Sequence, residues 1–224
     1  MQGKGNLPKR ADAITDEEIN TLYEKGCLGA DTPSSLLNTM WFLNTLHFGI
    51  RGGRGKEHRS LCWGDLSLKC DTNIKLEYVE YSERQTKTCT GADVRNTRDS
   101  RPRMYEMKND DHCPVKMYKA YKGERPTDYN QEDKPFSLAP VTNKFKPNDN
   151  EQWFLRAPVG RNKLNNLMKL MAKEAELPDL ETKRITNTSV RKHLCQKLLD
   201  NNIPDTQAVH ITGHKNPSSL INYR

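Results

Sequence analysis

Apolar and polar positions follow two different periods along this chain, and each period predicts a different kind of element. Apolar residues recur at helical spacing after Thr15, densely over 34–48, and again after Pro114 and Gly160. Residues 74–81 instead alternate apolar and charged side chains, which is typical of a half-buried strand. The pattern therefore predicts an α+β fold that is mainly helical.

Two helices near the start of the chain carry clear signals. Thr15 can cap a helix, and Glu18 three residues later can complete a capping box. A second helix is expected from Ser34 to about Phe48, and its apolar residues are too numerous for a half-solvated face. We therefore expect this second helix to be the central buried helix of the domain.

Later segments repeat the helical pattern with breaks between them. A helix is predicted to begin at Pro114, another follows Gly160 with Asn162 as a candidate N-cap, and a third covers about 189–199. Residues 127–150 are rich in Pro, Asn, Asp and Lys. They predict a long loop with one apolar anchor, at about Phe136 to Ala139.

Length and composition fit an intracellular protein with one large domain or two small ones. With 224 residues the chain is long enough to bury a substantial core. Residues 1–13 are polar and basic and are predicted to be a tail or linker, so the domain itself is expected over 14–224. The sequence contains neither an apolar run of membrane-spanning length nor an initial secretory signal, so no membrane partner is expected.

The charge balance changes the functional picture. The chain has 36 Lys and Arg against 29 Asp and Glu, a net charge of +7. A basic protein of this kind favours a polyanionic partner, and nucleic acid is the commonest one, although a modest excess also occurs in proteins that bind none.

The six cysteines are scattered without a CxxC pair, which favours reduced thiols over a structural zinc site. A metal site built from His112, Cys113, Cys62 and Cys70 is the less favoured alternative.

Candidate chemistry is concentrated at the end of the chain. Arg191 lies near the start of the last long helix, His214 follows a glycine, and Tyr223 comes nine residues after that histidine. If these three side chains converge, they can bind a phosphodiester and attack it. Upstream, Arg51 follows the central helix and enters a glycine-rich turn, which can direct its guanidinium into a cleft. A solvated basic loop explains the same residues equally well.

Several motifs, taken in order, resemble the catalytic domain of tyrosine recombinases, and more narrowly the Crypton-type domain. That domain is also found domesticated at the C-termini of zinc-finger MYM-type and glutamine-rich nuclear proteins. The resemblance covers about residues 11–224 and implies the tyrosine recombinase/integrase catalytic-domain fold, with a small antiparallel sheet. The matching stretches are Phe48-Gly49-Ile50-Arg51, Cys113-Pro114-Val115, Arg125-Pro126, Pro135-Phe136-Ser137-Leu138-Ala139, Trp153-Phe154, Thr186-Asn187-Thr188-Ser189-Val190-Arg191 and Thr212-Gly213-His214.

The resemblance implies roles for the nucleophile and for the residues that hold the phosphate. Tyr223 would attack phosphorus and form a covalent phosphotyrosine, which conserves the bond energy for rejoining. Arg51 and Arg191 would clamp the non-bridging oxygens, where negative charge builds up. Arg54 is the alternate for Arg51, because the loop after Gly49 is longer than in the family.

The remaining implied roles concern protons and partners. Lys87, in a hairpin turn, would protonate the departing sugar oxygen, and His214 would donate to a phosphate oxygen. The family reaction needs no metal or other cofactor. Double-stranded DNA is the implied partner, with assembly of several copies on it, and the nucleus is the implied location.

One position departs from the family pattern. Recombinases usually have a histidine three residues before the second arginine, a candidate general base, and Thr188 stands there instead. His193, two residues past Arg191, should face elsewhere on the helix. Two functions therefore stay open: a DNA-cutting and rejoining enzyme acting through Tyr223, or a catalytically inactive module that binds DNA or protein.

Each assignment also has an ordinary structural interpretation. Tyr223 could be a packing tyrosine, His214 could cap a turn, and Lys87 lies among many other basic residues.

Overall fold

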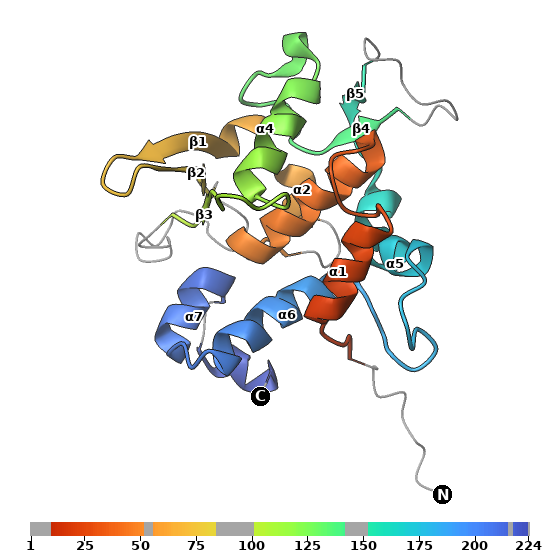
Figure 1. Ribbon diagram of the computed structural model, residues 1–224, viewed down its shortest axis with the longest axis vertical. Helices are drawn as coiled ribbons and strands as arrows, with labels where there is room; N and C mark the ends of the chain where they lie inside the picture. Colours follow the sequence, from red (N-terminus) through yellow and green to blue (C-terminus); the bar gives the residue numbers. More distant parts are fainter. Residues whose placement is uncertain (1–9, 52–55, 84–100, 142–151, 215–216, 224) are drawn as a thin grey trace, which may run out of the picture.

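The computed structural model describes residues 10–51, 56–83, 101–141, 152–214 and 217–223 of the chain. Helices dominate this part, and the strands form two small antiparallel sheets, β1-β2-β3 and β4-β5. Figure 1 shows α2 in the middle of the molecule, the first sheet and α4 beside it, and α6 and α7 at the end that holds the C-terminus. The predicted α+β, mainly helical class is confirmed.

The first two helices form as the sequence predicts. In α1 (Asp16–Glu24), the Thr15 hydroxyl accepts from the Glu18 amide and the Glu18 carboxylate accepts from the Thr15 amide, so the capping box is present. Helix α2 (Pro33–Phe48) is buried along nearly its whole length, which confirms it as the central helix. Since several other helices and strands contact α2, its C-terminal end, from which Arg51 emerges, is firmly positioned.

The first sheet consists of β1 (Leu66–Asp71), β2 (Leu76–Tyr81) and β3 (Arg103–Tyr105). The strand predicted over 74–81 is confirmed as β2, beginning two residues later. Its buried Glu80 is bonded to three cations of the neighbouring strands and their ends: Lys69, Arg101 and Arg103. This cluster links the C-terminal end of β2 to the N-terminal end of β3, the two strands that flank residues 84–100.

A short second sheet lies beyond α4 (Pro114–Glu124), which begins at the expected proline. It pairs β4 (Leu138–Pro140), which overlaps the predicted anchor, with β5 (Phe154–Pro158). Arg125 is buried next to this sheet and donates to the carbonyl oxygens of Tyr129, Pro135 and Phe136. The Arg-Pro motif therefore has a structural role here.

The helices of the C-terminal half complete the fold. Helix α5 (Arg161–Glu174) has Gly160 at its N-cap position, with no side-chain cap. The prediction that Asn162 caps this helix is wrong, because Asn162 already lies inside the first turn. Helix α6 (Asn187–Asp200) starts at Thr186, whose hydroxyl accepts from the Thr188 amide.

The remaining elements are α7 and several short helices. These are α3 (Lys56–Ser60), η2 (Trp63–Asp65), η4 (Thr127–Tyr129), α7 (Asp205–Thr212) and η5 (Pro217–Tyr223).

Gly49 allows the C-terminal end of α2 to pack closely against the C-terminal end of α7. It adopts a left-handed conformation (φ 64°) as the C-cap of α2. A Cβ added at Gly49 would lie 2.5 Å from the carbonyl oxygen of Thr212, so only glycine allows the two backbones to approach this closely. This contact places the loop that carries Arg51 next to the turn that carries His214.

The segment before α1 is fastened to the region around α6. The Asp12 amide donates to the Arg184 carbonyl over 2.9 Å, and the Arg184 amide donates to Asp12 Oδ2 over 2.7 Å. His193 Nδ1 lies 2.7 Å from the Ile14 carbonyl oxygen, and its Nε2 lies 3.5 Å from Asp16 Oδ1. The prediction that His193 faces away from the candidate site is confirmed.

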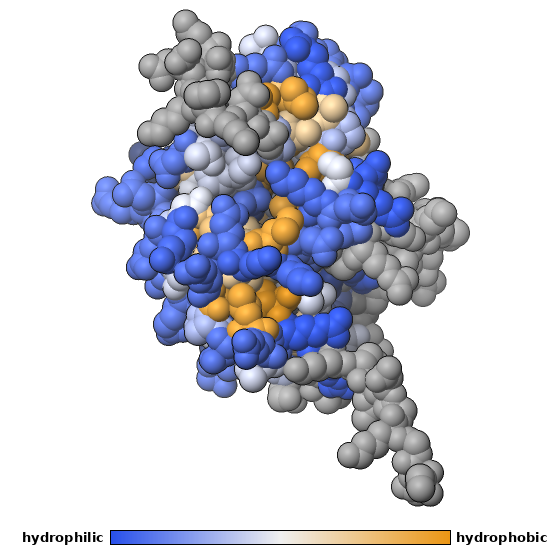
Figure 2. All heavy atoms as spheres, turned by 90° about the vertical axis from the view of Figure 1, so that its right-hand side faces the viewer, coloured by the Kyte–Doolittle hydropathy of each residue, from blue (hydrophilic) through white to orange (hydrophobic). Residues whose placement is uncertain are grey.

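The side of the molecule that carries α5 and β5 has a mostly hydrophilic surface broken by apolar areas (Figure 2). Large exposed apolar side chains there include Leu155 on β5 and Leu170 on α5. Among the helices that the structure describes, none has the length and apolar character needed to span a bilayer.

Candidate phosphodiester-binding site

Arg191 is a buried cation that forms no ion pair with any of the described residues. Its side chain lies in the first half of α6 and the residue is only 6% exposed. Its Nε and Nη2 atoms have no hydrogen-bond partner among the described residues. Burial, and then the charge of Arg51, lower the pKa of its guanidinium below the usual value. Unpaired buried donors are costly, so the arrangement fits an anion as the missing partner. Because both atoms are almost completely covered, an anion reaches them only when the neighbouring groups move aside.

His214 is held in one orientation by its neighbours. It directly follows Gly213, the left-handed C-cap of α7. The Thr212 hydroxyl donates to the Ala208 carbonyl over 2.7 Å and lies 2.6 Å from His214 Nδ1. Because Thr212 has a single hydroxyl proton, and because a carbonyl can only accept, Nδ1 must carry the proton that it shares with Thr212. The unprotonated Nε2 then faces Tyr223.

The local charges keep His214 neutral. Burial, followed by the charges of Arg191 and Arg51, lowers the pKa of His214 to about 4. At neutral pH its Nε2 is therefore a hydrogen-bond acceptor. The phosphate-donor role that the family resemblance implies for His214 stays a prediction.

Tyr223 stands directly beside that acceptor. Its hydroxyl oxygen lies 3.5 Å from His214 Nε2, the long end of hydrogen-bond range, and the two rings meet edge to face. Burial raises the pKa of the Tyr223 phenol, while the charges of Arg191 and Arg51 act in the opposite direction. The hydroxyl is therefore protonated at neutral pH and needs a base before it can attack.

Packing fixes the short helix that carries Tyr223. Leu220 of η5 is fully buried in a second apolar cluster with Cys195 of α6 and with Ala208 and Val209 of α7. Tyr223 packs against the same cluster. The C-terminal turn therefore lies against α6 and α7 and presents Tyr223 towards Arg191.

Arg51 completes the group that the structure brings together. Its backbone amide donates to Glu57 Oε2 over 2.7 Å, and its Nε lies 3.6 Å from Glu57 Oε1. Its charge acts on Arg191, His214 and Tyr223, so it lies near all three. Two other predicted site residues, Arg54 and Lys87, lie outside the described residues.

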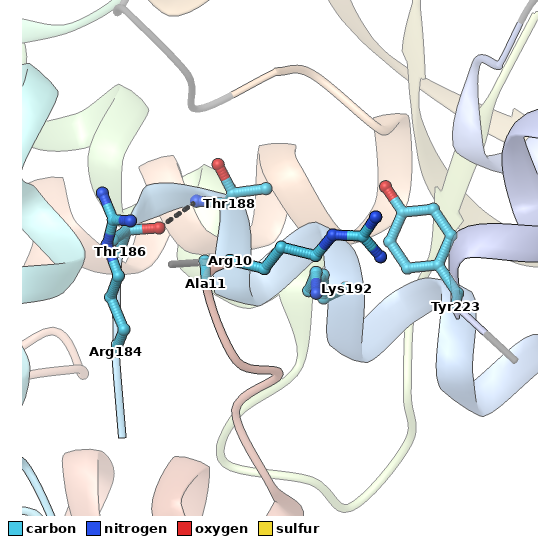
Figure 3. A pocket seen from close by; sticks show the side chains of 7 residues that line it. All are labelled: Arg10, Ala11, Arg184, Thr186, Thr188, Lys192 and Tyr223. Carbon is cyan, nitrogen blue, oxygen red and sulfur yellow. Dashed lines mark hydrogen bonds between the residues drawn. The ribbon is translucent and has the colours of Figure 1, made fainter. Parts of the chain in front are cut away.

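Thr188 lines a pocket of about 390 Å³ together with Tyr223 (Figure 3). Lys192, one helical turn further along α6, lines the same pocket, and its Nζ lies 5.9 Å from the centre of the Tyr223 ring. A histidine at position 188 would therefore share a pocket with Tyr223. Threonine offers no proton acceptor there at neutral pH.

Sequence reasoning missed three residues of this region. Arg10 was assigned to the tail but lines the pocket, and its guanidinium points towards Tyr223 (Figure 3). Lys192 follows Arg191 and shares a helix face with Thr188, a spacing that could have identified it. Thr212 orients His214, and its place before Gly-His was the available signal.

The metal alternative gains no support from the structure. No group of three or more His, Cys, Asp or Glu side chains suited to a metal ion occurs among the described residues. Five of the six cysteines lie in the described part, and these five are free thiols.

Comparison with known proteins identifies related chains. The family model described as "Domain of unknown function (DUF3504)" matches residues 13–173. Zinc finger MYM-type protein 2 of Mus musculus is 28% identical over 165 residues, covering 67% of this chain and 12% of the relative. Zinc finger MYM-type protein 3 of Homo sapiens is 26% identical over 163 residues, again 67% of this chain and 12% of the relative. The chain thus matches a small part of much longer proteins.

Solved structures share the fold at low sequence identity. XerA recombinase superposes with a TM-score of 0.51 at 17% identity, covering 96% of this chain and 61% of that one. A lambda integrase (75–356) dimer bound to a core site gives 0.52 at 14% identity, covering 96% and 60%. XerH site-specific recombinase bound to its difH substrate gives 0.53 at 13% identity, covering 97% and 51%. The predicted recombinase catalytic-domain fold is therefore confirmed.

Proposed function

The chain belongs to the DUF3504 family and has the fold of tyrosine recombinase catalytic domains, and we propose that it binds double-stranded DNA and attacks a phosphodiester with Tyr223. The observation that carries this proposal is Arg191. Its buried guanidinium has two nitrogen atoms without partners among the described residues, beside a histidine and a tyrosine. The oxygens of a phosphate fit such a planar donor.

Phosphate binding uses the two arginines together. Arg191 supplies its unpaired Nε and Nη2 to non-bridging oxygens, and Arg51 supplies the second guanidinium. In the free protein, the Arg51 guanidinium is near Glu57, so binding of a phosphate redirects this side chain from a carboxylate to the substrate. The pair is exposed, so its rearrangement costs little.

His214 supplies the base that Thr188 cannot. Its Nε2 takes the proton from the Tyr223 hydroxyl while the phenolic oxygen forms a bond to phosphorus. The bond from phosphorus to the departing sugar oxygen breaks, and the products are a 3'-phosphotyrosine and a free 5'-hydroxyl. The Thr212 hydroxyl oxygen stabilises the imidazolium by accepting a hydrogen bond from its Nδ1–H, and the bound phosphate offsets the repulsion from Arg191.

The departing oxygen needs a proton, and Lys87 is the residue proposed to provide it. Lys87 belongs to the connection between β2 and β3, and the ion pairs of Glu80 hold the strand ends from which this connection starts and to which it returns. Rejoining reverses these steps: the 5'-hydroxyl attacks the phosphotyrosine, Lys87 accepts its proton and His214 returns one to Tyr223. No cofactor takes part.

Thr188 favours a second candidate function, a module that binds DNA without cutting it. The family relationship to zinc finger MYM-type proteins supports a regulatory setting of this kind. Both candidates imply a nuclear protein derived from a Crypton-type element, a domain over 14–224 and assembly of several copies on DNA. In both, Arg191 binds a backbone phosphate.

Substitution of Arg191 by Met tests the shared claim. Removing a buried unpaired charge should leave the free energy of unfolding unchanged or raise it, because the unsatisfied donors cost about 1–3 kcal/mol. Affinity for a DNA duplex should fall at the same time. The matched control is Lys122→Met at an exposed position of α4. If Arg191→Met destabilises the fold and leaves DNA affinity intact, Arg191 is a structural residue and the proposal is wrong.

A further inference from the structure

We propose a second phosphate subsite beside Tyr223, in which Arg10, Arg184 and Lys192 hold the backbone phosphate that neighbours the one under attack. The ligand class is a DNA strand, and the inference rests on the proposed function. The subsite lies in the pocket of about 390 Å³ at the start of α6. Neither the family match nor the relatives assign a role to this pocket.

The lining of the pocket is cationic on several sides. Arg10 comes from the segment before α1, Arg184 from the loop before α6, and Lys192 from α6 itself. Figure 3 shows the Arg10 side chain reaching across the pocket towards Tyr223, with Arg184 at the other end. None of the described residues that line this pocket carries a carboxylate, so its lining is basic.

Hydroxyl groups add donors that suit phosphate oxygens. Thr186 and Thr188 both line the pocket, and their side chains lie in the first turn of α6 or immediately before it. Hydroxyls and basic side chains together are the usual contacts to a DNA backbone. A threonine at position 188 therefore has a use in this subsite, although it cannot serve as a base.

Hydrogen bonds hold the Arg10 segment in place. The Asp12 and Arg184 backbones are joined by the bond between the Asp12 amide and the Arg184 carbonyl. The Asp12 carboxylate accepts from the Arg184 amide in return. Two residues further on, the Ile14 carbonyl contacts His193 of α6. The backbone beside Arg10 is thus fixed to the helix that carries Arg191 and Lys192.

The position relative to Tyr223 identifies which phosphate binds. Tyr223 lines this pocket, and its hydroxyl oxygen also lies 3.5 Å from His214 Nε2, in the group that contains Arg191. A phosphate bound at Arg191 and one bound in the pocket would therefore flank the same tyrosine. Successive phosphates of one strand provide that arrangement, and the subsite would fix the register of the strand at the nucleophile.

Salt-dependent DNA binding by the full chain tests the subsite. We would measure the affinity of a short fluorescein-labelled duplex by anisotropy over a range of salt, for the wild type and for the double variant Arg10→Gln/Lys192→Gln. Losing one phosphate contact should lower the slope of log K against log salt by about 1. Lys122→Gln on α4 alone, and with Lys119→Gln, provides the charge-matched controls. Arg10→Lys combined with wild-type Lys192 should retain most of the slope.

The outcomes separate the subsite from the proposed function. A reduced slope in the double variant, with unchanged slopes in the α4 controls and an unchanged melting temperature, supports the subsite. Equal slopes for the wild type and the double variant, with tight binding in both, overturn the subsite and leave the proposed function standing. A wild type that does not bind the duplex overturns both. An equal loss in the α4 double control shows only general charge attraction and also overturns the subsite.

Discussion

Substitution of Gly49 by Ala should destabilise the fold through its contact with α7. Two physical effects act at this position. Gly49 has φ 64°, where a Cβ costs about 1–2 kcal/mol. The new Cβ would also lie 2.5 Å from the Thr212 carbonyl oxygen, which belongs to backbone and has little freedom to move aside.

The steric clash can be separated from the backbone strain by a control variant. A carbon and an oxygen normally approach to ~3.3 Å at closest, so the backbones must separate by roughly 0.8 Å. Overpacking of this kind typically costs about 1–3 kcal/mol beyond the conformational strain. Gly26, the matched control, has φ 68° and nothing within 4 Å of the added Cβ. Gly26→Ala should therefore show the strain alone.

Urea unfolding at neutral pH measures both variants. Gly49→Ala should lose about 1–3 kcal/mol more than Gly26→Ala, equivalent to a further drop of about 2–12 °C in melting temperature for a domain of this size. Equal losses would refute the close approach of α2 to α7, and with it the account of how the Arg51 loop is held beside His214.

Two further predictions concern pH and the departure from the family pattern. The pKa of His214 is lowered to about 4 and that of buried His58 to about 3, while both have a pKa near 6.5 in the unfolded chain. Below pH 6.5 the unfolded chain therefore binds protons that the folded protein does not. The contribution of these histidines to stability is complete above pH 6.5 and is lost as the pH falls towards the folded pKa values. The free energy of urea unfolding should therefore decrease from about pH 7 to about pH 5, and an NMR titration of His214 with a midpoint near 6.5 would contradict the assignment. Thr188→His places an imidazole in the pocket of Tyr223. If His214 is the base, the rate of covalent adduct formation should stay within about twofold of the wild-type rate. A gain of about 10²-fold or more would show instead that the wild type lacks a general base.

Local signals in the sequence predicted the helices well because they depend on neighbouring residues. Thr15 and Glu18 specify their capping box within one turn, and the apolar density of residues 34–48 marks a helix buried on all sides. The strands β1 and β5 were missed, since short strands draw their stability from partners distant in the sequence. Asn162 was misassigned because a capping residue type near a helix start does not fix the first residue of the helix.

For the candidate site too, the sequence predicted the identity of the residues but not the properties that depend on distant neighbours. Motif order led to Arg51, Arg191, His214 and Tyr223, and the structure brings these four together. Their electrostatic state was not predictable, because the unpaired guanidinium and the tautomer of His214 depend on burial and on neighbours such as Thr212. Arg10 was missed for a related reason. The segment that carries it is positioned by hydrogen bonds between Asp12 and Arg184, which lie 172 residues apart in the sequence.

Covalent trapping is the most direct test of the central claim that Tyr223 attacks a phosphodiester with help from His214. The wild-type chain is incubated with a nicked suicide duplex, and protein–DNA adducts that survive denaturation are counted beside Tyr223→Phe and His214→Gln. The account predicts an adduct with the wild type, none with Tyr223→Phe, and a loss of about 10²–10⁴-fold in rate with His214→Gln. An equal adduct with Tyr223→Phe, or no adduct from a wild type that binds the duplex, would contradict it.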